Sequence, residues 1–245
     1  MNIKKKETIK HCIATSFLLI AICIVIIIII KYQVNGEKNM PFQLSKITII
    51  STAEGIQNNS NLDVKWNMDI NQSNDVYFFI DKNNKTTETS KIKSVTIENI
   101  QITDPLKGTI KTYMPNSAEG RRFVYDDNFL VKDKLEYKGA KASNEKNLEI
   151  GNQGGNFSIR FANTNVATYS SNDDTEIVHN GSLIKKAGLK NEEIKFKVNF
   201  DLIIQIDQIK YKANIDLELP YDDILEKGTT QIEKTNMQDI VFKRM

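Results

Sequence analysis

The chain has 245 residues, with 33 Lys or Arg against 31 Asp or Glu, and only two His and two Cys. Four lysines lie within the first 30 residues, so the rest of the chain is close to neutral, with charges of both signs interspersed. It therefore offers no basic stripe for phosphate groups, and we expect no nucleic-acid partner. Both cysteines, Cys12 and Cys23, lie near the N-terminus. This excludes disulfides, thiol catalysis and Cys/His zinc sites from the remainder.

An apolar run at residues 13–30 predicts a transmembrane helix. At about 1.5 Å per residue it spans roughly 27 Å, close to the hydrocarbon thickness of a bilayer. The lysines before it predict a cytoplasmic stub at residues 1–12 and an extracytoplasmic C-terminal part. A cleaved signal peptide is the alternative, but bulky residues at 24–30 and the sequence at 31–35 lack a small-residue cleavage pattern. We therefore expect an uncleaved signal anchor in the cell membrane, with lipid around the helix.

Residues 31–45 are polar enough to predict a short tether, and residues 46–245 form the predicted β-rich extracytoplasmic domain. Period-two alternation begins at Ile47 and Ile49 and continues at residues 64–70, which predicts strands there. The polar residues 71–75 are predicted to form a turn. Residues 76–80 are apolar at successive positions, which predicts a central strand buried on both faces.

A slip in the alternation within residues 92–102 predicts a β-bulge near Glu98 and Asn99. The region 116–147 is more polar than its surroundings and contains two glycines. Two interpretations stay open for it: a boundary between two β domains, or a long excursion within one continuous domain.

The clearest prediction is a C-terminal hairpin, because residues 194–206 and 209–219 each carry an unbroken alternation of apolar side chains. A two-residue loop at residues 207–208 would pair Lys197 with Glu218 on the polar face, and a four-residue loop would preserve the same register. A slip by one residue would turn every apolar side chain to water, so this register is strongly specified.

After the hairpin, we expect a short helical turn at residues 221–226 and a last strand near residues 240–242. Many short strands with one apolar face each predict a mostly β fold. The expected architecture is thus an N-terminal transmembrane helix followed by an antiparallel, immunoglobulin-like β-sandwich.

Candidate sites each have a simpler structural interpretation. His179 is the only imidazole after the apolar run and lies in a predicted strand end, so catalysis through it is disfavoured. The glycine-rich segment 151–156 is followed by strand alternation, which favours a hairpin turn over a phosphate loop. Acidic clusters at 126–128 and 172–176 suit calcium but are typical of solvated turns. Arg160 is predicted on the outer face of a strand. The sequence assigns no catalytic, cofactor-binding or metal-binding residue.

Several short segments resemble a group of bacterial single-pass membrane-anchored β-rich proteins that has no assigned activity. The resemblance covers nearly the whole chain and rests on Met40-Pro41-Phe42, Ser45-Lys46-Ile47, residues 51–55, residues 152–155, Phe200-Asp201-Leu202 and residues 241–244. It implies the anchor-plus-β architecture and brings no ligand or catalytic residue.

The expected function is a membrane-anchored extracytoplasmic interaction or accessory protein of the cell envelope, with an envelope or membrane-protein partner. The alternative is an exported carboxylate-dependent hydrolase acting on cell-wall polymers, since acidic residues are plentiful although no pair stands out. A calcium-stabilised surface module is a third hypothesis.

Overall fold

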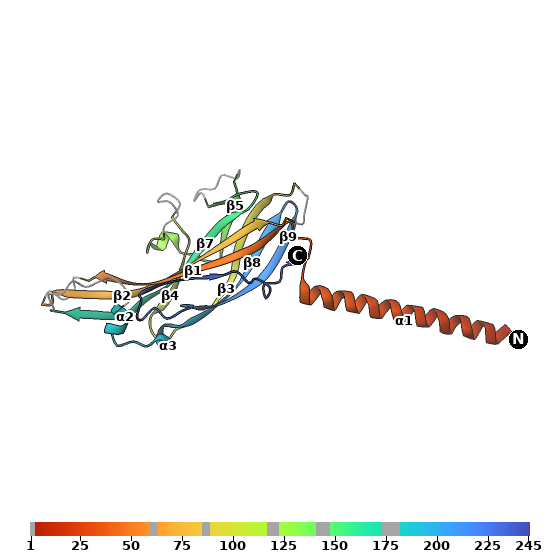
Figure 1. Ribbon diagram of the computed structural model, residues 1–245, viewed down its shortest axis with the longest axis horizontal. Coiled ribbons are helices and arrows are strands. Elements are labelled where there is room, and N and C mark those ends of the chain that lie inside the picture. Colours follow the sequence, from red (N-terminus) through yellow and green to blue (C-terminus); the bar gives the residue numbers. More distant parts are fainter. Residues whose placement is uncertain (1–2, 59–62, 85–88, 117–122, 141–147, 173–181) are drawn as a thin grey trace.

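The computed structural model describes residues 3–58, 63–84, 89–116, 123–140, 148–172 and 182–245 (Figure 1). A long N-terminal helix projects from a mostly β body made of two sheets. This confirms the predicted fold class in its coarse form.

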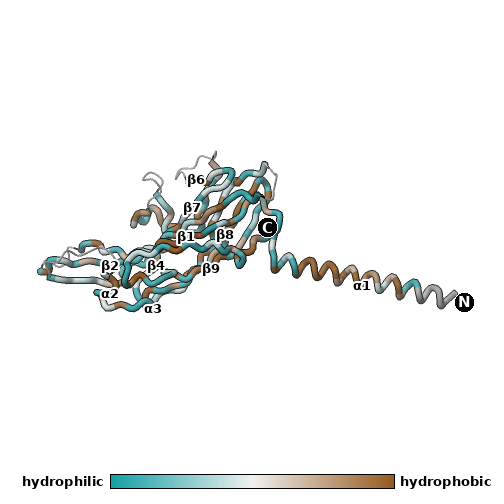
Figure 2. The backbone as a smooth tube through the Cα atoms, viewed as in Figure 1, coloured by the Kyte–Doolittle hydropathy of each residue, from teal (hydrophilic) through white to brown (hydrophobic). Residues whose placement is uncertain are grey.

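The N-terminal helix, α1, runs from Ile3 to Asn35. Its apolar stretch is exposed on every side, with Phe17 exposed to 69% and Ile27 to 62%, and it forms the brown band in Figure 2. Within the described residues it is the one helix long and apolar enough to cross a membrane. Its length and composition fit a membrane anchor and, equally, a signal sequence.

The body consists of a 5-stranded sheet, called sheet A here, and a 6-stranded sheet, called sheet B. The strands of sheet A are, in spatial order, β10 (Thr229–Lys234), β1 (Phe42–Gln57), β2 (Trp66–Lys82), β7 (Gly155–Ser171) and β4 (Thr109–Tyr113). Those of sheet B are β11 (Lys243–Arg244), β9 (Ile209–Leu219), β8 (Phe196–Ile206), β3 (Ile92–Thr103), β5 (Lys134–Gly139) and β6 (Glu149–Ile150). Neighbours are antiparallel except β5 and β6. Strands from both sides of the polar region 116–147 contribute to each sheet.

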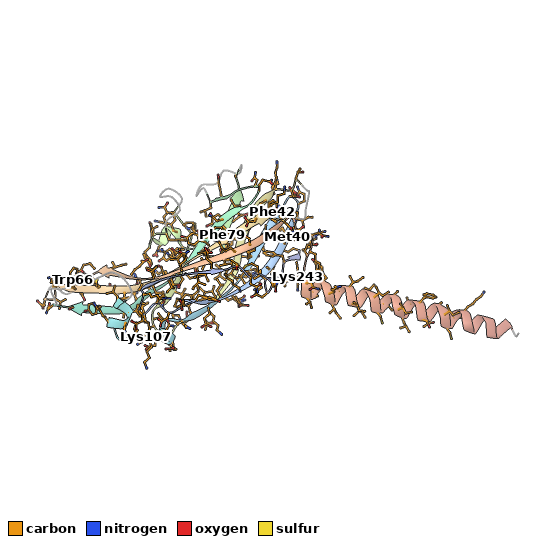
Figure 3. The ribbon with its side chains drawn as sticks, viewed as in Figure 1. Met40, Phe42, Trp66, Phe79, Lys107 and Lys243 are labelled. Carbon is orange, nitrogen blue, oxygen red and sulfur yellow. The ribbon has the colours of Figure 1, made fainter. Side chains whose placement is uncertain are left out.

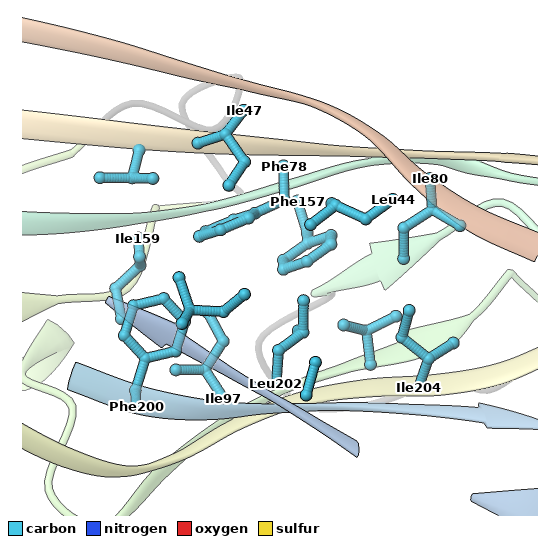
Figure 4. Packing of buried hydrophobic residues seen from close by; sticks show 14 of the residues in the cluster. Leu44, Ile47, Phe78, Ile80, Ile97, Phe157, Ile159, Phe200, Leu202 and Ile204 are labelled. Carbon is cyan, nitrogen blue, oxygen red and sulfur yellow. The ribbon is translucent and has the colours of Figure 1, made fainter. Parts of the chain in front are cut away.

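The main hydrophobic core lies between the two sheets (Figure 4). Phe78 of β2 stacks on Phe157 of β7 with ring centroids 4.9 Å apart. It also meets Phe200 of β8 edge-on at 5.9 Å, which joins sheet A to sheet B. All three side chains are almost fully buried, so alternate residues of each strand build this core.

A second, smaller core covers the end of sheet A farthest from α1. Two short helices, α2 (Ser182–Lys186) and α3 (Asn191–Ile194), contribute to it together with residues of β1, β2 and β7. Its buried members are Ala53, Met68, Ile70, Val166, Leu183, Ile184, Ile194 and Ile224. Sequence patterns did not predict α2 or α3, because each is too short to show a helical period.

The predicted register of the C-terminal hairpin is confirmed from Phe196 to Leu219, but Ile194, expected in the first strand, belongs to α3. Lys197 faces Glu218 and Ile206 faces Ile209, so the loop consists of Asp207 and Gln208. Asp207 has φ +50°, a left-handed value that Asp tolerates better than most residues. The bulge in β3 is also confirmed, by a register shift between Glu98 and Gln101.

Three other predictions were wrong. The expected turn at residues 71–75 is the middle of β2, which runs unbroken from Trp66 to Lys82 because its polar side chains find partners within sheet A. The expected strand at residues 240–242 is replaced by β11, and β10 was missed. The glycine-rich segment 151–156 does turn, but it leads from β6 of sheet B into β7 of sheet A and closes no hairpin.

Candidate functional site

Two features of the described residues, among others, gather polar or apolar groups in one place. One is a charged cluster on the outer face of sheet A, and the other is a groove where α1 meets the β body. Each is built from segments that the chain brings together from distant positions.

The charged cluster is centred on an ion pair between Asp75 of β2 and Arg160 of β7. These residues are direct cross-strand partners, so their side chains leave sheet A on the same face. Arg160 Nε donates to Asp75 Oδ1 at 2.6 Å, and Nη2 donates to Oδ2 at 2.9 Å. The two side chains are only 11% and 14% exposed. This is a two-point, nearly buried pair, the arrangement in which Arg binds a carboxylate most strongly.

An aromatic cover, defined as residues 123–131, lies over this pair. The Arg160 guanidinium carbon is 4.9 Å from the centroid of the Phe123 ring and 5.4 Å from that of Tyr125. Backbone bonds hold the cover to β4: Met114 N donates to Phe129 O, and Val131 N donates to Thr112 O, both at 2.9 Å. The outer face of sheet A is therefore closed over Arg160 by cation–π packing.

Burial dominates the electrostatics of the cluster. The pKa of Asp75 is raised above its ordinary value of 3.8, because loss of hydration outweighs the hydrogen bonds and charge of Arg160. The pKa of Arg160 is also raised: burial alone would lower it, but its bonds to Asp75 prevail. Burial, and then the charge of Glu54, raise the pKa of Tyr125. The Tyr125 hydroxyl lies near Glu54 and Ser73 without a hydrogen bond of ordinary geometry to either.

The polar groups of the cluster are bonded to one another and have a structural role. Both oxygens of Asp75 are bonded to Arg160, and Glu54 accepts a hydrogen bond from the Ser73 hydroxyl at 2.9 Å. A glycosidase needs two carboxyl groups that can reach the substrate from either side of the scissile bond. Here Asp75, the more buried carboxylate, holds Arg160, whose guanidinium packs against the aromatic cover, so the pair helps to fix residues 123–131 on sheet A.

Close packing and hydrogen bonds join the end of α1 to the β body. Gly36 follows the helix with φ +65°, and a Cβ at this position would lie 2.4 Å from Phe242 O. Glu37 N donates to Phe242 O at 2.8 Å, and Arg244 N donates to the Tyr32 hydroxyl at 2.9 Å. The last turn of α1 is thus bonded to the C-terminal segment, which itself pairs with β9 through β11.

A groove of about 720 Å³, called the junction groove here, opens beside this joint. Figure 3 shows Met40, Phe42 and Lys243 close to the end of α1. The apolar lining comes from both ends of the chain and comprises Val34, Met40, Phe42, Leu44, Met237, Ile240, Val241 and Phe242. Glu37, Lys38 and several Asn, Gln, Ser and Thr residues complete it. Sequence reasoning missed the groove, because its two walls lie at opposite ends of the chain.

Replacing Gly36 by Ala is expected to loosen the joint. The left-handed φ alone costs an L-residue about 1–2 kcal/mol, and the new Cβ must in addition displace Phe242. We expect the amides of Glu37 and Arg244 to lose protection in hydrogen exchange of the full-length protein in detergent. Gly188 has a similar φ of +74°, and no atom lies within 4 Å of the position that a Cβ would take there, so Gly188→Ala isolates the backbone strain. Equal protection of the Glu37 and Arg244 amides in the Gly36→Ala and Gly188→Ala variants would contradict a close joint between α1 and the C-terminal segment.

The remaining candidate residues have structural roles or lie outside the described part of the chain. His179 and most of the acidic cluster at 172–176 lie outside the described residues. Asp126 caps a short 3-10 helix by accepting from Asn128 N, and Asp127 pairs with Lys111. The described residues contain no group of three or more His, Cys, Asp or Glu placed to hold a metal ion.

Comparison with models of protein families, with curated proteins and with solved structures finds no match to this chain.

Proposed function

We propose that the chain is a membrane-anchored interaction or accessory protein of the cell envelope. In this proposal α1 is retained as a signal anchor, with residues 1–12 in the cytoplasm and the β body outside as an immunoglobulin-like sandwich. The β body then holds a fixed orientation at the membrane surface and offers its outer faces to an envelope or membrane-protein partner.

The observation that carries the proposal is the bonding of the helix end to the β body. Tyr32 and Gln33 belong to the last turn of α1 and are bonded to Arg244 N and Lys243 Nζ at 2.9 and 2.7 Å. A retained anchor needs such a joint to orient its domain, whereas a leader that is removed does not. The two sheets, antiparallel except for β5 and β6 and packed on either side of the main core, support the sandwich part.

A hydrolase ranks second. The most buried carboxylate of the charged cluster, Asp75, is bonded through both oxygens to Arg160 and covered by aromatic rings. We therefore give the interaction role priority.

The orientation of the anchor can be tested with cysteine labelling, since the natural cysteines lie only in or before the apolar run. In intact cells a membrane-impermeant maleimide is expected to leave Cys12 unlabelled until the membrane is permeabilised. In a Cys12→Ser/Cys23→Ser background, Tyr221→Cys places a thiol at a site 52% exposed, and we expect it to be labelled in intact cells. The reverse pattern would overturn the orientation.

The interaction role is tested by capture of tagged full-length protein from crosslinked cells. The matched control replaces residues 13–30 with an unrelated apolar helix and keeps everything from residue 31 onward. A specific partner retained by both forms would place the binding surface on the β body, and one lost with the helix exchange would place it on α1. Absence of any specific partner in both would contradict the proposed function.

A further inference from the structure

We infer that the junction groove binds one phospholipid of the bilayer that α1 crosses, with an acyl chain along its apolar lining and the phosphate beside Lys31 and Lys38. The inference rests on the proposed function, because it requires α1 to stay in the membrane. It adds a ligand class and a binding site to that function.

The depth of the groove in the bilayer follows from its distance from the apolar run along α1. Ile30 is the last residue of the apolar run, and Val34 of the same helix already lines the groove. At about 1.5 Å per residue, Val34 lies roughly 6 Å beyond Ile30 along the axis. The headgroup layer adds roughly 5–7 Å to each side of the hydrocarbon core. The groove therefore opens within the headgroup layer.

The joint described above keeps the groove at that depth. Glu37 and Arg244 are bonded to Phe242 O and the Tyr32 hydroxyl. Because these bonds link the helix end to the C-terminal wall of the groove, the wall cannot lift away from the membrane independently of α1. A freely tethered domain would give the groove no defined depth.

Apolar side chains form one part of the lining and suit a lipid tail. Val34 is exposed there and Met237 and Ile240 are half-buried, while Met40 and Phe42 belong to the main core beneath them. Methionine side chains are flexible and polarizable, so they adapt to an irregular apolar ligand such as an acyl chain. Apolar side chains that face the lower edge of the headgroup layer lie beside the glycerol-linked part of the acyl chains.

The charges at the mouth match a phosphate. Lys31 lies one turn before Val34 on the same side of α1, and Lys38 belongs to the lining. Both are exposed, and neither side chain has a hydrogen-bond or ion-pair partner among the described residues. The nearby Lys243 is instead bonded to Gln33, and Arg244 pairs with Glu37. Two ammonium groups without partners among the described residues lie beside a groove lined by both polar and apolar side chains, which suits an amphipathic phospholipid better than an apolar helix of a partner protein.

The test uses full-length protein reconstituted into vesicles of phosphatidylcholine and phosphatidylglycerol that contain a trace of phospholipid with a photoreactive acyl chain. After illumination, we expect lipid adducts on residues 37–45 and 235–242 in addition to those on α1. Lys31→Glu/Lys38→Glu should lower the groove adducts several-fold, and Met237→Trp, which fills the groove, should do the same. Lys107→Glu is the control, since Lys107 is exposed and lies on a part of the body away from α1 (Figure 3).

The outcomes separate the inference from the proposed function. Protein that resists carbonate extraction but carries adducts only on residues 13–30 would overturn the lipid site and leave the anchor intact. Release of the protein by carbonate would overturn the anchor itself. Groove adducts unchanged by charge reversal would overturn the phosphate assignment. In native membranes, a photoreactive amino acid at Met237 that crosslinks to a protein and not to lipid would replace the lipid by a protein occupant.

Discussion

Arg160→Met is expected to lower the free energy of unfolding by about 3–5 kcal/mol, because it leaves the carboxylate of Asp75 buried without its partner. Asp75 is 14% exposed, so water can replace little of the lost interaction. The variant also loses the packing of the guanidinium on Phe123 and Tyr125, which loosens the aromatic cover. Urea unfolding of the full-length protein in detergent, followed by the fluorescence of the single Trp66, measures the change.

Two matched variants isolate the cause. In Asp75→Leu/Arg160→Met both charges are gone, and we expect most of the stability to return, because apolar replacement of a whole buried pair is often neutral. Lys185→Met removes one partner of an ion pair with Glu226 whose side chains are 60% and 66% exposed. Exposed pairs contribute about 1 kcal/mol or less. A loss in Arg160→Met no larger than that in Lys185→Met would contradict a stabilising role for the buried pair.

The pH dependence of Arg160→Met has a defined sign. Removing Arg160 takes away the interactions that lower the pKa of Asp75, so burial raises this pKa further above its ordinary 3.8. The folded state then binds the proton more tightly than the unfolded state, and stability falls as pH rises through the folded-state pKa. The deficit relative to the natural protein should therefore be largest at neutral pH and shrink as pH falls towards 3.8.

Elements whose partners are close in sequence could be predicted. The β8–β9 hairpin pairs Phe196 with Leu219 and Ile206 with Ile209 around a two-residue loop, so the local alternation contained the whole register. The bulge near Asn99 could also be predicted, because it shifts the alternation of apolar side chains locally. The position of Arg160 on the outer face followed from its apolar neighbours alone.

Features that depend on distant residues could not be predicted. The ion pair of Arg160 joins residues 85 apart in sequence, and the junction groove is walled by both ends of the β body. Residues 71–75 look like a turn because they are polar, yet in the folded chain Ser51 and Phe161 supply their partners. Polarity in a sequence shows that a group needs a hydrogen bond and does not show whether water or the protein provides it.

Asn74 shows the structural role of these buried polar side chains. Its side chain is fully buried and accepts from the Ser51 hydroxyl at 2.8 Å and from Gln72 Nε2 at 3.3 Å. It also donates to Phe161 O at 3.1 Å. Ser51 and Asn74 are direct cross-strand partners in sheet A, between the main core and the smaller one. The bonds therefore hold β1 and β2 in register where apolar packing alone would permit sliding.

Asn74→Leu is expected to lower the free energy of unfolding by roughly 2–6 kcal/mol, because the Ser51 hydroxyl and the Gln72 amide would both lose their acceptor inside the protein. Ser51→Ala removes one donor and should cost about 1 kcal/mol. The double variant should lose less free energy of unfolding than the sum of the two single variants, because one fewer buried donor is left without an acceptor. Gln231→Leu, on the exposed edge strand β10, is the control and should leave the urea midpoint nearly unchanged. If Asn74→Leu instead matched the natural protein in stability, the polar layer would be dispensable, and packing in the two cores alone would have to fix the register of β1 on β2.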